Sequence, residues 1–425
     1  MIPVICICFF VLLFLGVPIA VILGVTTTVS LVFFANTPLH IIAQQLFNAL
    51  DNFVLLAIPY FILAGAIMTR GGIAKRLIAF VNALVGWFPG GLAMAGILGC
   101  IFFAAISGSS PATVVAIGSI MIPALIKAGY GEKFSLGLIT SAGSLGIVIP
   151  PSIPMILYCL VMNVSVAKMF MAGVLPGLLI GALLMVYTFI VAKYNNWRLE
   201  SAFSLPEIFR TAKEGVWALL LPFIVLGGIY SGIFTPTEAA AVSVVYALFV
   251  ELFIYKEFRI REITGICRDA AVLSACLLFI LSCAMTFIWL LTAEQIPQQL
   301  ADIIIRHIDS PWMFLLSVNI LFLVLGCFMD DVSAMLVLAP IFLETLNRYG
   351  IDLVHFGVVM VLNIQMGMLT PPFGLNLFVA SGITGKPLHT IARGVMPFLG
   401  IMFLCLLLIT YIPWISLVLP NLLLR

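Results

Sequence analysis

Residues 86–126 read GWFPGGLAMAGILGCIFFAAISGSSPATVVAIGSIMIPALI, an apolar stretch interrupted by the segment SGSSP at 107–111. As one helix rising 1.5 Å per residue, the stretch would be about 60 Å long, twice the roughly 30 Å hydrocarbon core of a bilayer. It must therefore cross twice, or enter and return as a re-entrant hairpin. Both alternatives end on the side where the stretch began, and we predict a re-entrant helical hairpin over 86–126.

The composition of the whole chain is that of a membrane protein. Of its 425 residues, 64% are hydrophobic and only 8% are charged, and the mean hydropathy is +1.28. A soluble domain carries about 25% charged residues, so a soluble enzyme is excluded. The formal net charge of +2 gives no indication of nucleic-acid binding. Spans of roughly 20 apolar residues fit about ten times into this length, which predicts an all-α polytopic membrane protein.

The two halves of the chain share Pro and Gly landmarks at a nearly constant offset. Val17-Pro18 corresponds to Thr235-Pro236, and the segment 146–151 (GIVIPP) corresponds to 367–372 (GMLTPP). Any two apolar segments look alike, but the same order of helix-opening and helix-breaking residues is hard to obtain by chance. We predict three parts: a first repeat at 1–195, a cytoplasmic linker at 196–215 and a second repeat at 216–425.

Each repeat is predicted to contain three helices, a hairpin, a Pro-interrupted helix and a last helix. In the first repeat these are 2–15, 18–35, 52–69, the hairpin 86–126, the broken helix 133–162 and 169–193. In the second they are 216–233, 236–255, 270–292, the hairpin 311–343, the broken helix 354–382 and 395–418. Residues 39–50 are amphipathic and too short to span, so we expect them at the membrane interface. Because a hairpin returns to its starting side, each repeat makes five net crossings, and the second must be inverted relative to the first.

The loop charges agree with this topology. When loops alternate across the membrane, all but four of the 19 Lys and Arg residues fall on one side. The positive-inside rule makes that side cytoplasmic, with the loops 70–86, 127–133, 193–215, 256–269 and 383–394. Both termini are therefore expected on the periplasmic side.

The first hairpin tip and the first Pro-Pro break predict an ion site. Backbone that leaves the helix inside a membrane must be buried in protein or line a wet cavity, and inverted repeats with such breaks are typical of secondary transporters. The tip supplies hydroxyls and flexible backbone, and the combination of tip and break recurs in the second repeat. Turn formation and close packing are the alternative roles for its Ser and Gly residues. We predict a sodium site around Ser107, Gly108, Ser110, Gly146, Ile149 and Ser152.

The second hairpin tip carries the adjacent acidic pair Asp330-Asp331 in an apolar run. A charge at the bilayer centre costs roughly 2.5–3.5 kcal/mol or more, so at least one of the two is expected to have a role or a partner. The alternative is that they cap the second helix of the hairpin. A proton-coupled carrier would more often show a buried His or an isolated Glu, and Glu251 is interpreted as interfacial. Because sodium prefers hard oxygen ligands, we predict a second sodium site around Gly326, Asp330, Gly367, Thr370 and Asn376.

The substrate is expected between the two tips, against the two breaks and near the midplane. The predicted substrate-binding residues are Ser109, Ser110, Thr113, Pro150, Pro151, Asp331, Pro371 and Pro372. No Arg lies in the hairpins or breaks, so recognition of an anion would rest on helix ends, amides and hydroxyls. These features do not distinguish a dicarboxylate from a sugar acid.

Four segments resemble the large membrane subunit of TRAP transporters, the DctM-like family: SGSSPAT at 107–113, IPPS at 149–152, FMDD at 328–331 and TPP at 370–372. The similarity extends over essentially the whole chain. It implies an elevator-type, sodium-coupled carrier of organic acids in the bacterial inner membrane. It also implies two partners, a small four-helix membrane subunit, expected here as a separate chain, and a periplasmic substrate-binding protein.

Two other classes of protein stay open at this point: a stand-alone carrier, and a membrane enzyme or channel. A stand-alone sodium/divalent-anion symporter would share the broad architecture but need no partners. A membrane enzyme is disfavoured, because the sequence shows no metal-ligand cluster and no Ser/His/Asp set. A channel is disfavoured because the polar residues gather at breaks rather than along one pore-lining face.

Overall fold

A computed structural model describes residues 2–34, 38, 40–197, 203–372 and 374–423, and its regular elements are all helices. In the first half of the chain these are α1 (Ile2–Phe14), α2 (Ile19–Phe34), α3 (His40–Asn48), α4 (Ala57–Arg70), α5 (Ile73–Val85), α6 (Gly91–Ser107), α7 (Ser110–Lys127), α8 (Glu132–Gly143), α9 (Ile153–Met162) and α10 (Val166–Tyr194). In the second half they are α11 (Leu205–Tyr230), α12 (Pro236–Phe249), α13 (Ile260–Ala293), α14 (Ile296–His307), α15 (Pro311–Gly326), α16 (Asp331–Tyr349), α17 (Leu353–Gly367), α18 (Leu375–Thr384), α19 (Leu388–Tyr411) and α20 (Trp414–Leu423). Short 3-10 turns at Phe53–Leu56 (η1) and Ser144–Ile147 (η2) and a π turn at Val250–Ile254 (η3) complete the set.

The prediction of an all-α polytopic membrane protein is confirmed. Seven helices of the described chain are long and apolar enough to cross a bilayer, and an eighth span results if the bent pair α14–α15 is counted as one. Further apolar helices, among them α6, α9, α17 and α18, are shorter than a full span. Such short pieces are what a hairpin and a broken helix produce when they share the membrane depth with other elements.

Both predicted hairpins are interrupted where the sequence indicated. The first consists of α6 and α7, which pack against each other and are separated by Gly108-Ser109. Gly108 has a φ of +62°, and the side chain of Ser109 caps α7. The second consists of α15 and α16, and Asp330 caps α16. Each tip therefore ends one helix and begins the next with a residue suited to a helix N-cap.

Both predicted breaks also lie at the Pro-Pro sequences. α8 continues into η2 and resumes as α9, while α17 ends at Gly367 and α18 begins at Leu375. The peptide bonds Pro150-Pro151 and Pro371-Pro372 are both cis. The same local geometry thus occurs at the corresponding positions of the two halves.

Several segments predicted as loops are helical. Residues 73–85 and 296–307 form the amphipathic helices α5 and α14, and α13 begins ten residues earlier than predicted. The predicted linker 196–215 is helical from Leu205 onward, where α11 begins, and the predicted last helix divides into α19 and α20. These helix bounds were predicted wrongly because charged residues were interpreted as marking the ends of helices. A helix can extend past the hydrocarbon core while its Lys and Arg side chains reach the interface.

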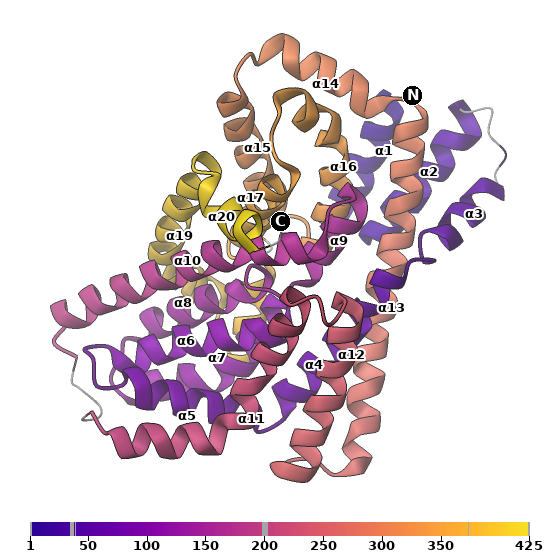
Figure 1. The fold of residues 1–425 in the computed structure, drawn as a ribbon. Helices are drawn as coiled ribbons and strands as arrows, with labels where there is room; N and C mark the ends of the chain where they lie inside the picture. The colour runs from indigo at the N-terminus through magenta and orange to yellow at the C-terminus, as the bar shows by residue number, and fades with distance from the viewer. Residues whose placement is uncertain (1, 35–37, 39, 198–202, 373, 424–425) are drawn as a thin grey trace.

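The two halves interlock around the hairpins. Figure 1 shows α5 to α8 and α10 stacked on one side, α1, α2, α3 and α13 on the other, and α14 to α17 above them. α8 packs against α19, and α9 packs against α16, so both parts of the first half's broken helix contact the second half. α4 packs against α12 and α13, and it also borders α6 and α7. The hairpin tips are therefore held between an interlocked cluster of helices and the long helices α4 and α13.

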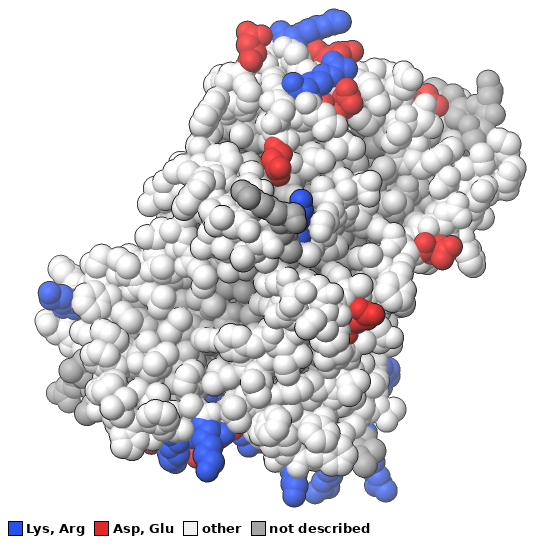
Figure 2. Space-filling model, in the orientation of Figure 1, with Lys and Arg blue, Asp and Glu red and all other residues white. Residues whose placement is uncertain are grey.

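The charged side chains lie at the two ends of the molecule. Figure 2 shows Lys and Arg gathered at the lower end, around α11, α12 and α13, whereas the upper end near α14 carries both signs of charge. The face between them is largely uncharged in this view and carries only scattered charges of both signs. This distribution is the one expected for a chain with an apolar belt in a bilayer.

Candidate functional site

The first tip and the first break are in backbone contact. We call residues 107–113 and 144–152 together the first tip–break pair. A Cβ atom on Gly108 would lie 2.6 Å from the carbonyl oxygen of Pro151, and one on Gly146 would lie 2.5 Å from that of Ser109. The backbone N–H of Ile153 donates to the carbonyl oxygen of Gly108 over 3.3 Å. Only glycine allows this approach at the two positions, so the sequence of the pair is dictated by its packing.

The hydroxyls of the first pair are buried and face backbone oxygens. The hydroxyls of Ser107 and Thr113 are 3.0 Å apart, and the Thr113 hydroxyl donates to the carbonyl oxygen of Ser109 over 2.9 Å. The Ser152 hydroxyl donates to the carbonyl oxygen of Ile147 over 2.6 Å. All three side chains are at most 1% exposed. The pair thus concentrates hydroxyl and carbonyl oxygens, which are hard ligands, among largely buried residues.

The second tip and the second break repeat the backbone contact. We call residues 326–331 and 367–376 the second tip–break pair. A Cβ atom on Gly367 would lie 2.4 Å from the carbonyl carbon of Gly326. The Asp330 carboxylate accepts the backbone N–H of Ser333 over 3.1 Å, which is the N-cap bond considered from the sequence. The Thr370 hydroxyl donates within its own turn, to the carbonyl oxygen of Met366 over 2.8 Å.

Among the described residues, two buried hydrogen bonds between side chains join the two halves, and the sequence did not indicate either. The Asn376 amide donates to the Ser110 hydroxyl over 2.6 Å, and the Gln365 amide donates to the Ser144 hydroxyl over 2.8 Å. The amide oxygens of Asn376 and Gln365 are buried and have no hydrogen-bond partner among the described residues. A buried acceptor without a protein partner is costly unless an ordered water or an ion satisfies it. Asn376, assigned to the second site from the sequence, thus also contacts a predicted member of the first.

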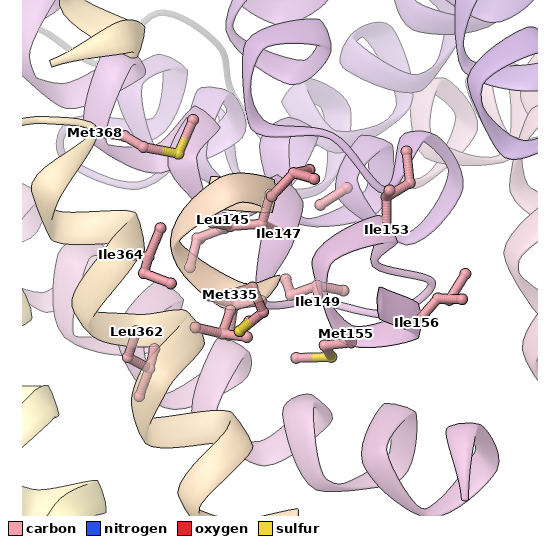
Figure 3. Packing of buried hydrophobic residues seen from close by; sticks show 14 of the residues in the cluster. Leu145, Ile147, Ile149, Ile153, Met155, Ile156, Met335, Leu362, Ile364 and Met368 are labelled. Atoms are coloured by element: carbon pink, nitrogen blue, oxygen red, sulfur yellow. The ribbon is translucent and has the colours of Figure 1, made fainter. Parts of the chain in front are cut away.

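Apolar side chains surround these polar contacts. Figure 3 shows Leu145, Ile147 and Ile149 of the first break close to Met335 of α16, with Ile364 of α17 beside them. The side chain of Ile149 also fills the space beside Gly177 of α10. Such packing excludes water and holds the two breaks in fixed positions.

A cavity of about 540 Å³ lies between the two tips and the helices α4 and α13. The first tip contributes Ser107, Gly108 and Ser109, and the second contributes Asp330 and Asp331. On the opposite wall are residues of α4 and α13: Ile62, Gly65, Ala66, Thr69, Arg70, Asp269, Ala270, Leu273 and Leu277. The size and the mainly apolar lining with a few polar groups suit a small organic molecule.

Only some of the predicted substrate-binding residues line this cavity. Ser109 and Asp331 line it. The cavity lining does not include Ser110, Thr113, Pro150, Pro151, Pro371 or Pro372. Pro150 and Pro151 are buried, and Ser110 and Thr113 are fully covered. The Pro-Pro residues therefore lie outside the cavity wall, and the breaks reach it only through the residues that follow them, Ile153, Pro154 and Leu375.

Two charged residues have positions that the sequence analysis did not predict. Arg70, counted as a loop residue, is the last residue of α4 and lines the cavity, where its guanidinium lies 2.6 Å from the Asp269 carboxylate. Glu251, interpreted as interfacial, is fully buried and accepts the backbone N–H groups of Gly72 and Ile73, each over 3.0 Å. Its carboxylate caps α5 from another helix, which is favourable at a helix N-terminus. The positions of Arg70 and Glu251 both depend on contacts with residues far away in the sequence, so local sequence patterns did not indicate them.

Comparison with known proteins gives a consistent result. The family described as "Tripartite ATP-independent periplasmic transporter, DctM component" matches residues 6–415. The chain is 48% identical over 399 residues, 94% of its length and 93% of the relative's, to the C4-dicarboxylate TRAP transporter large permease protein DctM of Pseudomonas aeruginosa. It is 44% identical over 433 residues to the protein of the same description from Vibrio cholerae, covering 97% and 96% of the two chains.

One solved structure shows the same fold at low sequence identity. It is the YdaH transporter of Alcanivorax borkumensis, with a TM-score of 0.64, 15% identity and coverage of 95% of this chain and 98% of that one. At this identity the likeness concerns the fold alone. The membrane helices, the hairpins with their breaks and the match over nearly the whole sequence lead to one assignment: this chain belongs to the DctM family of TRAP transporter large permeases, a transport protein and not an enzyme.

Proposed function

We propose that the chain is the carrier subunit of a sodium-coupled tripartite transporter that takes up an organic acid, with a C4-dicarboxylate as the first candidate. The observation that carries this proposal is a cavity that both hairpin tips border. The two relatives described above are named for C4-dicarboxylate transport, which suggests the substrate class. The partners proposed from family membership are a small four-helix membrane subunit and a periplasmic substrate-binding protein.

An elevator mechanism is supported by how the two walls of the cavity are connected. One wall is formed by the tips, which belong to the interlocked helices of both halves, and the other by α4 and α13. α4 leads to α6 through α5, and α13 leads to α15 through α14. These two amphipathic connectors have similar lengths, 13 and 12 residues. Movement of the tips past α4 and α13, with α5 and α14 as flexible links, would open the cavity to each side in turn.

The oxygen groups of the two tip–break pairs fit sodium. The first pair offers buried hydroxyl and carbonyl oxygens, and the second offers the Asp330 carboxylate. The unpartnered amide oxygen of Asn376 lies where the pairs meet. Bound sodium would supply positive charge beside a cavity that must hold an anion. Carboxylate, carbonyl and hydroxyl oxygens are the ligands that hard cations prefer.

The orientation is proposed from the charges. We assign the end rich in Lys and Arg in Figure 2 to the cytoplasm by the positive-inside rule. From the alternation of the loops we propose that both termini face the periplasm, and from the family that the membrane is the bacterial inner membrane. The inverted arrangement of the two repeats belongs to the same proposal. It would place the two hairpins so that they enter the membrane from opposite sides.

Reconstitution tests the proposed function. The chain is incorporated into proteoliposomes with its small membrane subunit, and uptake of radiolabelled succinate is measured with and without the binding protein under an inward sodium gradient. We expect saturable uptake only when all three components are present. Saturable uptake by the chain alone would instead support the stand-alone sodium/divalent-anion symporter. Absence of uptake by the complete system would contradict the proposed substrate class.

A further inference from the structure

The charges that line the cavity are unbalanced for a carrier of anions. Among the described lining residues, Arg70 is the only Lys or Arg, whereas three carboxylates face the same space: Asp269, Asp330 and Asp331. A dicarboxylate entering such a cavity would be repelled unless cationic groups meet it. Arg70 is the one fixed cation on the lining, and it lies on α4, across the cavity from the two tips.

The ion pair of Arg70 leaves most of its donors available. Its Nη2 atom donates to Oδ2 of Asp269 over 2.6 Å, and this is the side-chain hydrogen bond that the described structure gives for the guanidinium. A guanidinium has five N–H donors in a planar fork that suits a carboxylate. The side chains of Arg70 and Asp269 are 54% and 44% exposed, so neither is enclosed by protein.

Asp269 has a second cationic partner. Arg268 donates to its other oxygen, Oδ1, from Nη2 over 3.2 Å and from Nε over 3.3 Å. The three side chains together carry one net positive charge. Asp269 therefore stays paired with Arg268 when Arg70 turns toward another carboxylate. The Asp269 carboxylate is then not left without a cationic partner.

We propose that Arg70 is a carboxylate-binding residue at the mouth of the cavity, which receives a carboxylate of the transported acid in exchange for Asp269. The inference rests on the proposed function and adds a binding residue on the wall formed by α4. The two acidic residues of the second tip repel the anion, and Arg70 attracts it toward the opposite wall. Asp269 acts as a competitor for the same guanidinium, which keeps binding there weak enough for release.

The test uses binding of radiolabelled succinate to the purified full-length chain by equilibrium dialysis, at fixed ionic strength and saturating sodium. Arg70→Gln should weaken succinate binding by about tenfold, because a bidentate charged contact is lost. Asp269→Asn should strengthen it by about threefold, because the competitor for Arg70 is removed. Arg348→Gln is the matched control: Arg348 also links two helices through a 2.5 Å ion pair, with Asp302, but does not line the cavity.

The opposite signs of the two effects separate binding from a structural role. An ion pair that only holds α4 to α13 would give the same change for both variants, and a misfolded protein cannot gain affinity. Unchanged binding in both variants, or a loss in both, would overturn the role of Arg70 while leaving the proposed function intact. A wild-type chain that binds no succinate would overturn the proposed substrate class and this inference together.

Discussion

The two tip–break pairs have the same backbone contact but different surroundings. In the first pair Ser107, Ser110, Thr113 and the Pro150-Pro151 break are buried, and every polar side chain is neutral. In the second pair the Pro371-Pro372 break is exposed, and the tip carries two half-buried carboxylates. The two pairs thus share the glycine contacts that shape the backbone and differ in charge. A carboxylate is tolerated in the second pair because it keeps contact with the cavity, whereas a bare charge in the buried first pair would be costly.

The largest expected effect concerns the carboxylates that distinguish the second pair. An Asp→Asn substitution removes the charge but keeps the side-chain shape and an oxygen that can still accept the N-cap hydrogen bond. We expect at least one of Asp330→Asn and Asp331→Asn to lower sodium-driven uptake by about tenfold or more, with normal amounts of protein in the membrane.

Asp352→Asn is a matched control for these two variants. Asp352 caps α17 through two backbone N–H groups, at 2.8 and 3.0 Å, and does not line the cavity. If Asp330→Asn, Asp331→Asn and Asp352→Asn all transport normally, the two tip carboxylates are only helix caps.

A second prediction tests the backbone contact that the two pairs share. Gly146→Ala and Gly367→Ala each place a Cβ atom about 2.5 Å or less from another backbone, at Ser109 and Gly326. Overpacking of this kind costs about 1–3 kcal/mol, so both variants should lower the thermal unfolding temperature of the purified chain. Gly382→Ala is the control, since its Cβ would meet no atom within 4 Å. Equal stability of all three variants would show that the glycine contacts do not shape the site.

The smallest expected effect concerns single hydroxyls. Ser110→Ala removes the partner of Asn376 in the first pair, and Thr370→Ala removes a hydroxyl of the second pair. Each should raise the sodium concentration for half-maximal uptake by about two- to fivefold, because one oxygen of a shared set is lost. Ser317→Ala is a suitable control, since its exposed hydroxyl bonds within α15 away from the cavity. A sodium dependence that is the same in all three variants would remove these hydroxyls from the ion sites.

The hairpins and breaks could be predicted because Pro, Gly and Asp in an apolar run have strong local consequences. The tips at Gly108-Ser109 and Asp330 and the breaks at the two Pro-Pro sequences lie where the sequence indicated. The backbone preferences of these residues are enough to indicate the positions of the tips and breaks from the sequence. The amphipathic helices α5 and α14 were missed because their charged residues resemble those of loops.

The composition of the cavity could be predicted only in part, because it depends on contacts between distant segments. Two of the predicted substrate-binding residues, Ser109 and Asp331, line it, but the Asn376–Ser110 bond connects residues 266 positions apart. Arg70 resembles a cytoplasmic loop residue in the sequence and becomes part of the lining only through the packing of α4 against α13. Local patterns contain no information about which helices become neighbours.

The sodium dependence of transport tests the central proposal most directly. In proteoliposomes that hold the complete system, the initial rate of succinate uptake is measured against external sodium, and again after the sodium gradient is dissipated. Two tip–break pairs joined by Asn376 and Ser110 predict a Hill coefficient above one and loss of accumulation without the gradient. Uptake that is indifferent to sodium and follows a proton gradient would contradict the account.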